Sequence, residues 1–350
     1  MDYFQKSRVK WPYVTHLVDR RCVQQVLPIE DGRDVGALVL ARVTKLGRHG
    51  DLEAPRGRRL TLFAGDVFVG ALGDRYATGQ FEGTAMISGG VGHIVSIGGV
   101  VGQVSSMNAS SPPPTAIEFL GRLADGEGRP LHMSQFQALP SETIENRSAT
   151  TILSLGAGMD SGKTTTAAHM VRSLTQAGHV VAAAKLTGTA CGKDANLLYD
   201  AGAVTVYDFT HAGWPSTANL SLDELMSIAG RIRAALATHD PEFVILEIAD
   251  GIVQRETAMM LADPDFHDSI DAVMFSGRGS LSCDAGVRRL HALGYTVLAT
   301  AGPVANSRLS TAEAEACCDL PCFSSQDILA GKMVPLLRSV TERRRSVPAA

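Results

Sequence analysis

A glycine-rich segment at residues 156–165 limits the folds open to this 350-residue chain more than any other feature. It lies between a short apolar run and a stretch with helical composition, and it reads Gly156-Ala157-Gly158-Met159-Asp160-Ser161-Gly162-Lys163-Thr164-Thr165. A glycine-rich turn that ends in Gly-Lys-Thr, set between a strand and a helix, is the context of the Walker A pattern. Backbone N–H groups of such a loop point inward, and the helix adds its positive end. The segment therefore predicts a binding site for a nucleoside triphosphate.

The residues of this loop have separate expected roles. Lys163 is expected to reach the β- and γ-phosphates and to act in catalysis, and the Thr164 hydroxyl is expected to bind Mg²⁺. Ala157 stands where the strict pattern has glycine, a departure that such loops often accept. The residues of the segment predicted to hold the nucleotide are Gly156, Gly158, Met159, Asp160, Ser161, Gly162, Lys163, Thr164 and Thr165. An ordinary glycine-rich turn is the alternative, and the Gly-Lys-Thr-Thr core argues against it.

From Thr150 onward, apolar runs alternate with helical patterns. The expected strands are residues 151–155, 179–185, 204–209, 243–248, 272–275 and 296–301, and the expected helices are residues 164–177, 222–238 and 285–293. Alternation of this kind builds a parallel sheet with helices on both faces. The fold class predicted for residues 146–350 is therefore α/β, with the parallel sheet of a P-loop NTPase. Ligands of such sheets bind at the carboxyl ends of the strands, where functional residues are expected to gather.

The first 145 residues have a different texture, because short apolar runs are separated by Gly and Asp. The runs are residues 37–43, 59–63, 67–72, 93–97 and 100–104. They predict a smaller β-rich domain, a barrel or a sandwich, over residues 1–145. A short helix is expected at Thr115–Leu123 after a proline-rich loop. The polar segment Thr143–Ala149 is the expected domain boundary.

Charged side chains stand at the ends of two predicted strands. Glu247 ends a buried run, and a buried carboxylate needs a partner such as a metal ion. Lys185 ends another strand, where a lysine can neutralise charge on a transferred phosphoryl group, and it is the second predicted catalytic residue. An exposed strand end is the alternative for both. The weaker candidates for substrate binding are Thr187, Asp208, Asp250 and Arg255, the last of which is equally compatible with a surface pair to Glu256.

At these residues the chain resembles dethiobiotin synthetase and its relatives among P-loop ligases and kinases. The shared skeleton is the loop with Lys163, a strand ending in Lys185, the segment Asp194-Ala195-Asn196-Leu197-Leu198 and a strand ending in Glu247. The resemblance implies that the two lysines hold transferring phosphate and substrate, and that Thr164, Asp194 and Glu247 surround Mg²⁺. It also implies that Asn306 lies near the adenine of ATP.

The resemblance covers about residues 150–325 and departs from the family in two places. The family usually has an acidic residue where this chain has Gly158. Its strand-end glutamate is followed at once by glycine, whereas Ile248-Ala249-Asp250 precede Gly251 here, which implies a different substrate pocket. The segment is also similar to an uncharacterised P-loop family whose members carry names such as molybdopterin-guanine dinucleotide biosynthesis protein. The β-rich first part has no counterpart in dethiobiotin synthetase, so biotin synthesis itself is not expected.

These features predict an enzyme that uses ATP and Mg²⁺ to phosphorylate or activate a small metabolite at a carboxylate, carbamate or hydroxyl. One alternative is a regulatory or adapter protein that binds GTP or ATP, although the chain has no Asn-Lys-x-Asp run for guanine recognition. A second alternative is an acyltransferase that holds the phosphates of coenzyme A in the loop. The acceptor substrate is not readable from the sequence.

Composition argues against several kinds of partner. The chain has 32 Lys and Arg against 36 Asp and Glu, and a net charge of −4 offers no general attraction for nucleic acid or an anionic membrane. The most apolar stretch, residues 87–104, is rich in glycine and contains His93, which is atypical of a membrane helix. No secretory signal is visible and the six cysteines are scattered, so a cytoplasmic location with free thiols is expected. The expected partners are a small-molecule substrate and a second copy of the chain in a homodimer. The run Arg343-Arg344-Arg345 is expected to form a frayed, solvated tail.

Overall fold

The computed structural model describes residues 8–141 and 149–346, and the chain forms two compact units. Unit 1 consists of Met1–Leu139, Gly188–Asn196 and Phe209–Asn219, and unit 2 consists of Pro140–Thr187, Leu197–Asp208 and Leu220–Ala350. The two shorter segments of unit 1 each follow a strand of unit 2 along the chain. The predicted boundary at residues 145 and 146 lies outside the described residues, so the limits 1–145 and 146–350 stay a prediction.

Unit 2 is built on a 7-stranded sheet in the order β15-β14-β16-β13-β17-β18-β19. The strands are β13 (Thr150–Gly156), β14 (Val181–Lys185), β15 (Val206–Asp208), β16 (Phe243–Glu247), β17 (Ala272–Ser276), β18 (Val297–Ala301) and β19 (Cys322–Phe323). Each neighbouring pair is parallel, so all carboxyl ends meet at one edge of the sheet. β13, β16, β17 and β18 are buried along their whole length, as unbroken apolar runs predict for strands covered on both faces. The predicted α/β class is confirmed.

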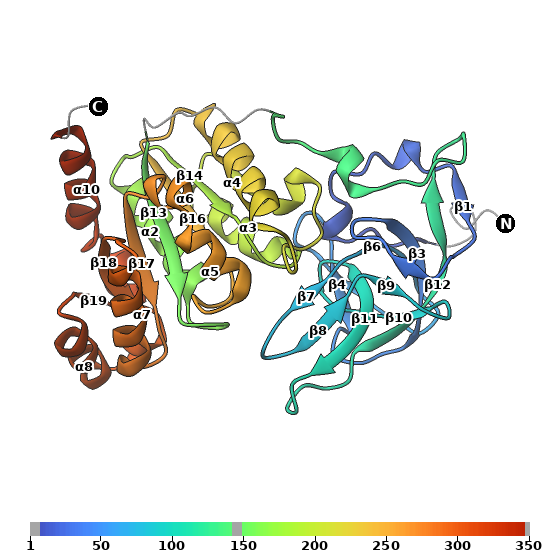
Figure 1. Ribbon diagram of the computed structural model, residues 1–350, viewed down its shortest axis with the longest axis horizontal. Coiled ribbons are helices and arrows are strands. Elements are labelled where there is room, and N and C mark those ends of the chain that lie inside the picture. Colours follow the sequence, from blue (N-terminus) through green and yellow to red (C-terminus); the bar gives the residue numbers. More distant parts are fainter. Residues whose placement is uncertain (1–7, 142–148, 347–350) are drawn as a thin grey trace. The chain divides into compact units, whose positions relative to one another are not determined.

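Helices cover both faces of this sheet (Figure 1). They are α2 (Lys163–Gln176), α4 (Leu222–Ala237), α5 (Arg255–Ala262), α6 (Pro264–Asp268), α7 (Ser280–Ala292), α8 (Arg308–Cys318), α9 (Ser325–Leu329) and α10 (Val334–Ser346), with the short η5 (Pro303–Asn306); α3 (Gly192–Asp200) begins in a segment of unit 1. The three predicted helices correspond to α2, α4 and α7, although α7 begins earlier than expected. The core between helices and sheet includes Met170 of α2, Phe243 of β16 and Leu337 of α10.

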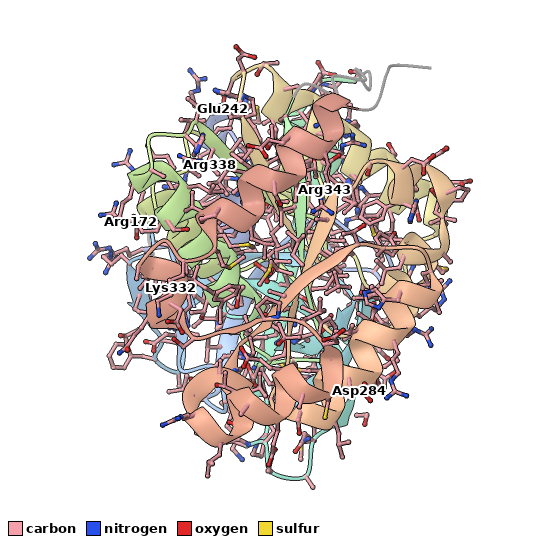
Figure 2. The ribbon with its side chains drawn as sticks, turned by 90° about the vertical axis from the view of Figure 1, so that its left-hand side faces the viewer. Arg172, Glu242, Asp284, Lys332, Arg338 and Arg343 are labelled. Atoms are coloured by element: carbon pink, nitrogen blue, oxygen red, sulfur yellow. The ribbon has the colours of Figure 1, made fainter. Side chains whose placement is uncertain are left out.

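The C-terminal arginines lie on a helix, so the expectation of a frayed tail is wrong for Arg343 and Arg344 (Figure 2). Leu337 and Val340, on the same helix, are buried in the core of unit 2. Two apolar residues three positions apart lie on one face of a helix, which explains why α10 docks. Nη1 of Arg344 also lies 3.3 Å from Oδ2 of Asp271. The prediction of a solvated tail relied on the three consecutive arginines and did not consider the apolar residues that precede them.

Unit 1 is β-rich, as predicted, and its central strands form a barrel. β12 pairs with β3, β3 with β6, β6 with β11, β11 with β10, and β10 again with β12, so the circuit closes. The strands of this unit are β1 (Gln25–Leu27), β2 (Gly32–Arg33), β3 (Leu38–Lys45), β4 (Asp51–Glu53), β5 (Arg59–Thr61), β6 (Val67–Leu72), β7 (Arg75–Tyr76), β8 (Phe81–Thr84), β9 (Met86–Ile87), β10 (Val91–Ile94), β11 (Val100–Met107) and β12 (Thr115–Ala124). The apolar side chains at its centre include Val39, Phe68, Ile94, Val101 and Phe119. Closure leaves few exposed strand edges, which stabilises a small sheet.

The helix expected at Thr115–Leu123 is wrong, because this segment is the strand β12. Its side chains alternate between buried and half-buried positions, with Ile117 and Phe119 buried and Glu118 between them half-buried. A period of two belongs to a strand with one face on the core. The alanine, glutamate and leucine residues of the segment favour a helix locally, and pairing with β3 and β10 overrides that preference.

The glycine-rich stretch at residues 87–104 contributes to β9, β10 and β11 of unit 1. Across residues 8–141 and 149–346, no helix combines the length and the apolar character that crossing a membrane requires.

His49 is expected to make the stability of unit 1 sensitive to acid. The ring is buried, and its Nδ1 lies 3.2 Å from the carbonyl oxygen of Ile94. Burial lowers the pKa of His49 from 6.5 to about 4, with a smaller contribution from the charge of Arg75. Between these two values the unfolded chain binds more protons than the folded one, so stability present above pH 6.5 is lost as the pH falls toward 4.

The loss in the free energy of unfolding over this pH range is expected to be about 3 kcal/mol at most. Urea denaturation of the whole chain at several pH values measures it. Glutamine does not bind a proton in this pH range, so the free energy of unfolding of the His49→Gln variant should fall less than that of the wild type. Equal pH dependence in the two proteins would contradict the assignment.

Candidate functional site

The glycine-rich loop joins the end of β13 to the start of α2, as the Walker A pattern predicts. Gly162, directly before the helix, has φ of 96°, and Asp160 has φ of 58°. Glycine adopts such left-handed backbone without steric cost. A Cβ on Gly162 would also lie 2.9 Å from the Cα of Gly302, in the segment after β18. Left-handed residues within a turn direct successive N–H groups toward one point, so the loop has the backbone of an anion site.

Lys163 is the first residue of α2 and is 6% exposed. Its Nζ donates to the carbonyl oxygen of Gly158 at 2.7 Å, so the side chain lies back along the loop. Burial lowers the pKa of Lys163, and the carboxylates of Glu247 and Asp250 oppose that effect. A buried ammonium is stabilised by an adjacent anion, and a phosphate group is such an anion.

Thr164, Glu247 and Lys185 come together at the carboxyl ends of β14 and β16. Thr164 Oγ1 donates to Glu247 Oε1 at 2.7 Å, and Lys185 Nζ lies 3.9 Å from the same oxygen. Lys185 and Glu247 face each other in the register of the two parallel strands. The Glu247 side chain is 2% exposed and that of Lys185 12%. Lys185 and Glu247 therefore lie near the loop, as expected for residues at the carboxyl ends of parallel strands.

The oxygens of Thr164 and Glu247 fit a Mg²⁺ ion that arrives with a nucleotide. Mg²⁺ prefers oxygen ligands, and it usually takes one or two from the protein and the rest from phosphates and water. A hydroxyl and a carboxylate oxygen 2.7 Å apart at the start of a helix would fit the protein share. In the part of the chain that the structure describes, no group of three or more His, Cys, Asp or Glu side chains is arranged to hold a metal ion.

The segment that follows β16 is held against the loop on several sides. The Ala249 N–H donates to Thr187 Oγ1 at 2.9 Å, and the Ile252 N–H donates to the Gly156 carbonyl oxygen at 3.2 Å. A Cβ on Gly251 would lie 2.5 Å from the carbonyl oxygen of Ala157. Only glycine permits so close an approach without displacing the loop. The two segments therefore form one wall of the site.

Two of the predicted substrate residues, Thr187 and Asp208, are buried at strand ends. The Thr187 hydroxyl accepts the Ala249 N–H, so it supports the segment after β16. Asp208 ends β15 and is in register with Lys185. The roles of Thr187 and Asp208 toward a substrate stay predictions.

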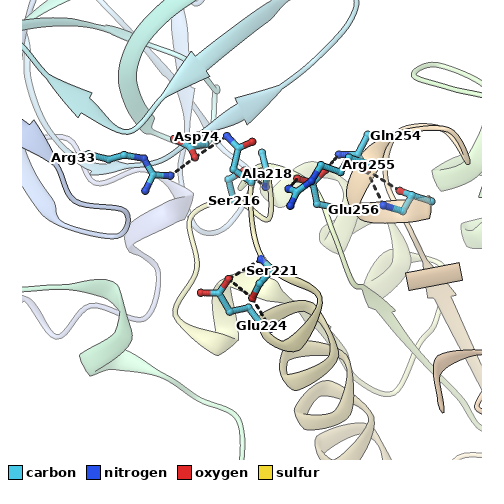
Figure 3. Close-up of polar contacts among 11 residues, drawn as sticks. Arg33, Asp74, Ser216, Ala218, Ser221, Glu224, Gln254, Arg255 and Glu256 are labelled. Carbon is cyan, nitrogen blue, oxygen red and sulfur yellow. Dashed lines mark hydrogen bonds and ion pairs between the residues drawn. The ribbon is translucent and has the colours of Figure 1, made fainter. Parts of the chain in front are cut away.

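Arg255 lies on the surface beside Glu256, at the start of α5 (Figure 3). Its side chain is 61% exposed, and Nη1 lies 3.2 Å from Glu256 Oε1. Gln254 caps the helix by accepting the Thr257 N–H at 2.9 Å, and it also bonds Glu256. These contacts match the surface pair that was the alternative for Arg255, and its role in substrate binding stays a prediction.

Asp194 and Asn306 were also predicted to contact the nucleotide or its Mg²⁺. Asp194 belongs to a segment of unit 1, whereas Thr164 and Glu247 belong to unit 2. Asn306 is exposed at the end of η5. Their predicted roles, as a Mg²⁺ ligand and at the adenine, stay predictions.

The sequence interpretation missed the contact between Gly302 and the phosphate loop. A Cβ on Gly302 would lie 2.3 Å from the carbonyl oxygen of Ser161, and its φ is 92°. The available signal was the Gly302-Pro303 pair directly after the apolar run of β18, since such a pair marks a tight turn at a strand end. The segment before Asn306 thus packs on the loop.

Unit 2 has the P-loop NTPase fold. A buried central strand, a glycine-rich loop ending in Gly-Lys-Thr and a helix follow one another, within a parallel sheet covered on both faces. The fold predicted from the sequence is confirmed at this level, and the dethiobiotin synthetase-like family is not.

No protein-family model matches the chain, and no curated protein matches it. Solved structures with some similarity include the 54 kDa signal recognition particle protein from Aeropyrum pernix K1 in complex with GDP, at 18% identity and a TM-score of 0.36, over 61% of this chain and 54% of that one. A ParA family ATPase from Chlorobium tepidum TLS has 13% identity and a TM-score of 0.33, over 58% of this chain and 94% of that one.

The signal recognition particle receptor FtsY from Elizabethkingia anophelis, in complex with GDP, has 14% identity and a TM-score of 0.37, over 55% of this chain and 66% of that one. The chain thus spans about half the length of the first of these proteins. The fold of unit 2 follows from its own strand order and loop, and not from these similarities.

Proposed function

We propose that the chain is an enzyme that uses ATP and Mg²⁺ to transfer a phosphoryl group to a small metabolite. The observation that supports this most is the meeting of Lys185 with Glu247 and Thr164 beside the phosphate loop. Lys185 Nζ lies 3.9 Å from Glu247 Oε1, which in turn accepts the Thr164 hydroxyl at 2.7 Å. Two lysines, a carboxylate and a hydroxyl are the groups that phosphoryl transfer requires of a protein.

The proposed roles follow from where each group lies. Phosphoryl transfer needs positioning and neutralisation of charge on the oxygens of the γ-phosphate. Lys163 would leave the Gly158 carbonyl oxygen and donate to β- and γ-phosphate oxygens. Lys185, at the end of the neighbouring strand, would neutralise charge that develops on the transferring group. Thr164 and Glu247 would hold Mg²⁺, which supplies further positive charge at the phosphates when bound.

Lys185 also favours an enzyme over a regulatory NTPase. Switch proteins often hydrolyse their nucleotide slowly until a partner inserts a cationic residue, which accelerates the step by about 10³- to 10⁵-fold. Here the chain carries a second cation at the end of β14, and its side chain is 12% exposed. Because the Lys185 side chain is nearly buried, the chain itself supplies this cation and does not need one from a partner. ATP is preferred over GTP in the proposal because the chain has no Asn-Lys-x-Asp run.

ADP release by the purified 350-residue chain tests the proposal. With Mg²⁺ and ATP, a small-molecule extract of cells should raise ADP formation well above the rate in buffer, and GTP should give less product. Thermal shifts with ATP and GTP, each with Mg²⁺, should show the same preference. A rate that the extract leaves unchanged, together with equal thermal shifts for both nucleotides, would instead support the regulatory alternative.

Lys185→Gln is expected to lower the rate of this stimulated reaction by about 10²- to 10³-fold, the usual cost of one catalytic charge. ATP binding should change much less, because Lys163 and the loop remain. Isothermal titration with ATP and Mg²⁺ measures the binding. If Lys185→Gln weakened binding and left the rate of bound nucleotide unchanged, Lys185 would be a nucleotide ligand and not a catalytic residue.

A further inference from the structure

A second carboxylate, that of Asp250, lies beside the phosphate loop and has no part in the roles above. Asp250 is half-buried and has φ of 60°. Non-glycine residues seldom adopt this conformation, although aspartate does so more often than most, and such residues are enriched at functional sites. The next residue is Gly251, which tolerates positive φ more easily. The chain therefore presents a carboxylate at a backbone position that favours glycine.

The position of Asp250 follows from the contacts of its neighbours. A Cβ on Gly251 would lie 2.9 Å from the Cα of Gly158, and the Gly158 carbonyl oxygen accepts a hydrogen bond from Lys163 Nζ at 2.7 Å. Burial lowers the pKa of Lys163, and the charges of Glu247 and Asp250 oppose that effect in part. The segment that carries Asp250 thus lies against the part of the loop that Lys163 contacts.

Glu247 and the segment that carries Asp250 contact different parts of the loop. Glu247 ends β16 and is bonded to Thr164, at the start of α2, where a metal would bind. Asp250 lies three residues further on, in the segment that packs on Ala157 and Gly158 at the other end of the loop. The Glu247 carboxylate is thus bonded at the helix end of the loop, and Asp250 belongs to a segment that contacts the strand end of the loop.

We propose that Asp250 is the catalytic base of the site, and that the acceptor is a small molecule that presents a hydroxyl group. The proposal rests on the proposed function and narrows its substrate class. In the step, the acceptor oxygen forms a bond to the γ-phosphorus of ATP, and the bond from that phosphorus to the bridging oxygen breaks. ADP carries away the electron pair of the broken bond, and the hydroxyl proton passes to the Asp250 carboxylate. The products are a phosphate ester and ADP.

A base is useful only for an acceptor that has a proton to lose. A carboxylate or carbamate acceptor is already ionised near neutral pH and attacks without one. General bases contribute about 10²- to 10⁴-fold to such reactions. The presence of Asp250 therefore favours a hydroxyl over the other two acceptors that the sequence left open.

Asp250→Asn, made in the whole 350-residue chain, tests the base. Asparagine tolerates positive φ as well as aspartate does, so the backbone should be unchanged. We expect kcat for transfer from γ-³²P-labelled ATP, with a small-molecule extract as the source of acceptor, to fall at least about 100-fold. The KM for ATP should stay within about threefold, because Asp250 contacts the acceptor. The matched control is Asp240→Asn, an exposed aspartate with φ of 47° before β16, and it should keep the wild-type rate.

The labelled product of the wild-type chain tests the acceptor. A phosphate ester survives neutral hydroxylamine and mild acid, and this result would support the proposal. Label released by hydroxylamine indicates an acyl phosphate, and label released by acid alone indicates a bond to nitrogen; either overturns it. Wild-type rates in Asp250→Asn would overturn the base while leaving the proposed function in place. A wild-type chain that forms no ADP and transfers no label would remove the proposed function and this inference together.

Discussion

Replacing Lys163 with methionine should abolish nucleotide turnover and most nucleotide binding. The ammonium is 6% exposed and lies on the loop itself, so no solvent-exposed lysine can take its place. Hydrogen bonds from a charged group contribute about 1.5–3 kcal/mol each, which corresponds to at least a tenfold loss of affinity. Loss of its charge on the transferring phosphate should lower the rate by about 10²- to 10³-fold more. Isothermal titration and ADP release, both with Mg²⁺ and ATP, measure the two effects.

Lys332→Met is the matched control, because Lys332 is 63% exposed and pairs with Asp327 on the surface of unit 2 (Figure 2). It should bind and turn over ATP as the wild type does. Lys163→Met should not unfold the chain, since burial already opposes the charged form of Lys163 and lowers its pKa. Melting curves of the variants check this point. ATP binding and turnover at wild-type levels in Lys163→Met would remove the phosphate site from the loop.

Elements of unit 2 were more predictable than those of unit 1, for a physical reason. Strands buried on both faces are unbroken apolar runs, and helices such as α4 begin with a capping box, here Ser221 with Glu224. β12 is buried on one face, so its signal was an alternation that the helix-forming residues at Ala116 and Glu118 obscured. The local preference pointed one way and the pairing partners, remote in sequence, decided otherwise.

The set of chain segments that make up unit 1 could not be predicted from the sequence. Residues 188–196 and 209–219 belong to it although strands of unit 2 precede them. Ser96 Oγ donates to the Ala190 carbonyl oxygen at 2.8 Å, and Asn219 Nδ2 donates to Asp74 at 2.9 Å. Asp74 also pairs with Arg33 (Figure 3). Polar side chains of this kind give no sequence signal of the distant partner they will meet.

In the candidate site, too, some residues could be predicted from local sequence and others could not. The Walker A pattern and the strand-end rule located Lys163, Lys185 and Glu247, because both depend on local sequence and on the parallel sheet. The contacts of Gly251 and Gly302 with the loop depend on how three strand ends meet in space. A single sequence shows these glycines only as turn residues.

Glu247→Gln should weaken Mg²⁺ binding and lower the rate of turnover, with little change in the shape of the site. The amide oxygen can still accept the Thr164 hydroxyl, whose present donor–acceptor distance is 2.7 Å. What is lost is the negative charge that Mg²⁺ requires and that both lysines face. We expect a fall of about 10- to 100-fold in metal affinity, as for other changes to a metal's surroundings, and at least that loss in rate. Mn²⁺ binding followed by electron paramagnetic resonance, with ATP present, measures the affinity.

The matched control for this variant lies on the segment that leads into the same strand. Glu242 directly precedes β16, its side chain is 52% exposed, and it pairs with His179 (Figure 2). Glu242→Gln removes the same charge at the opposite end of β16, so metal affinity and rate should stay at wild-type values. If Glu247→Gln kept wild-type Mn²⁺ affinity and lost only the rate, Glu247 would act on the lysines and not on a metal. Another carboxylate would then have to bind the metal. Asp250 would be a candidate for that role, and its assignment as the base would no longer hold.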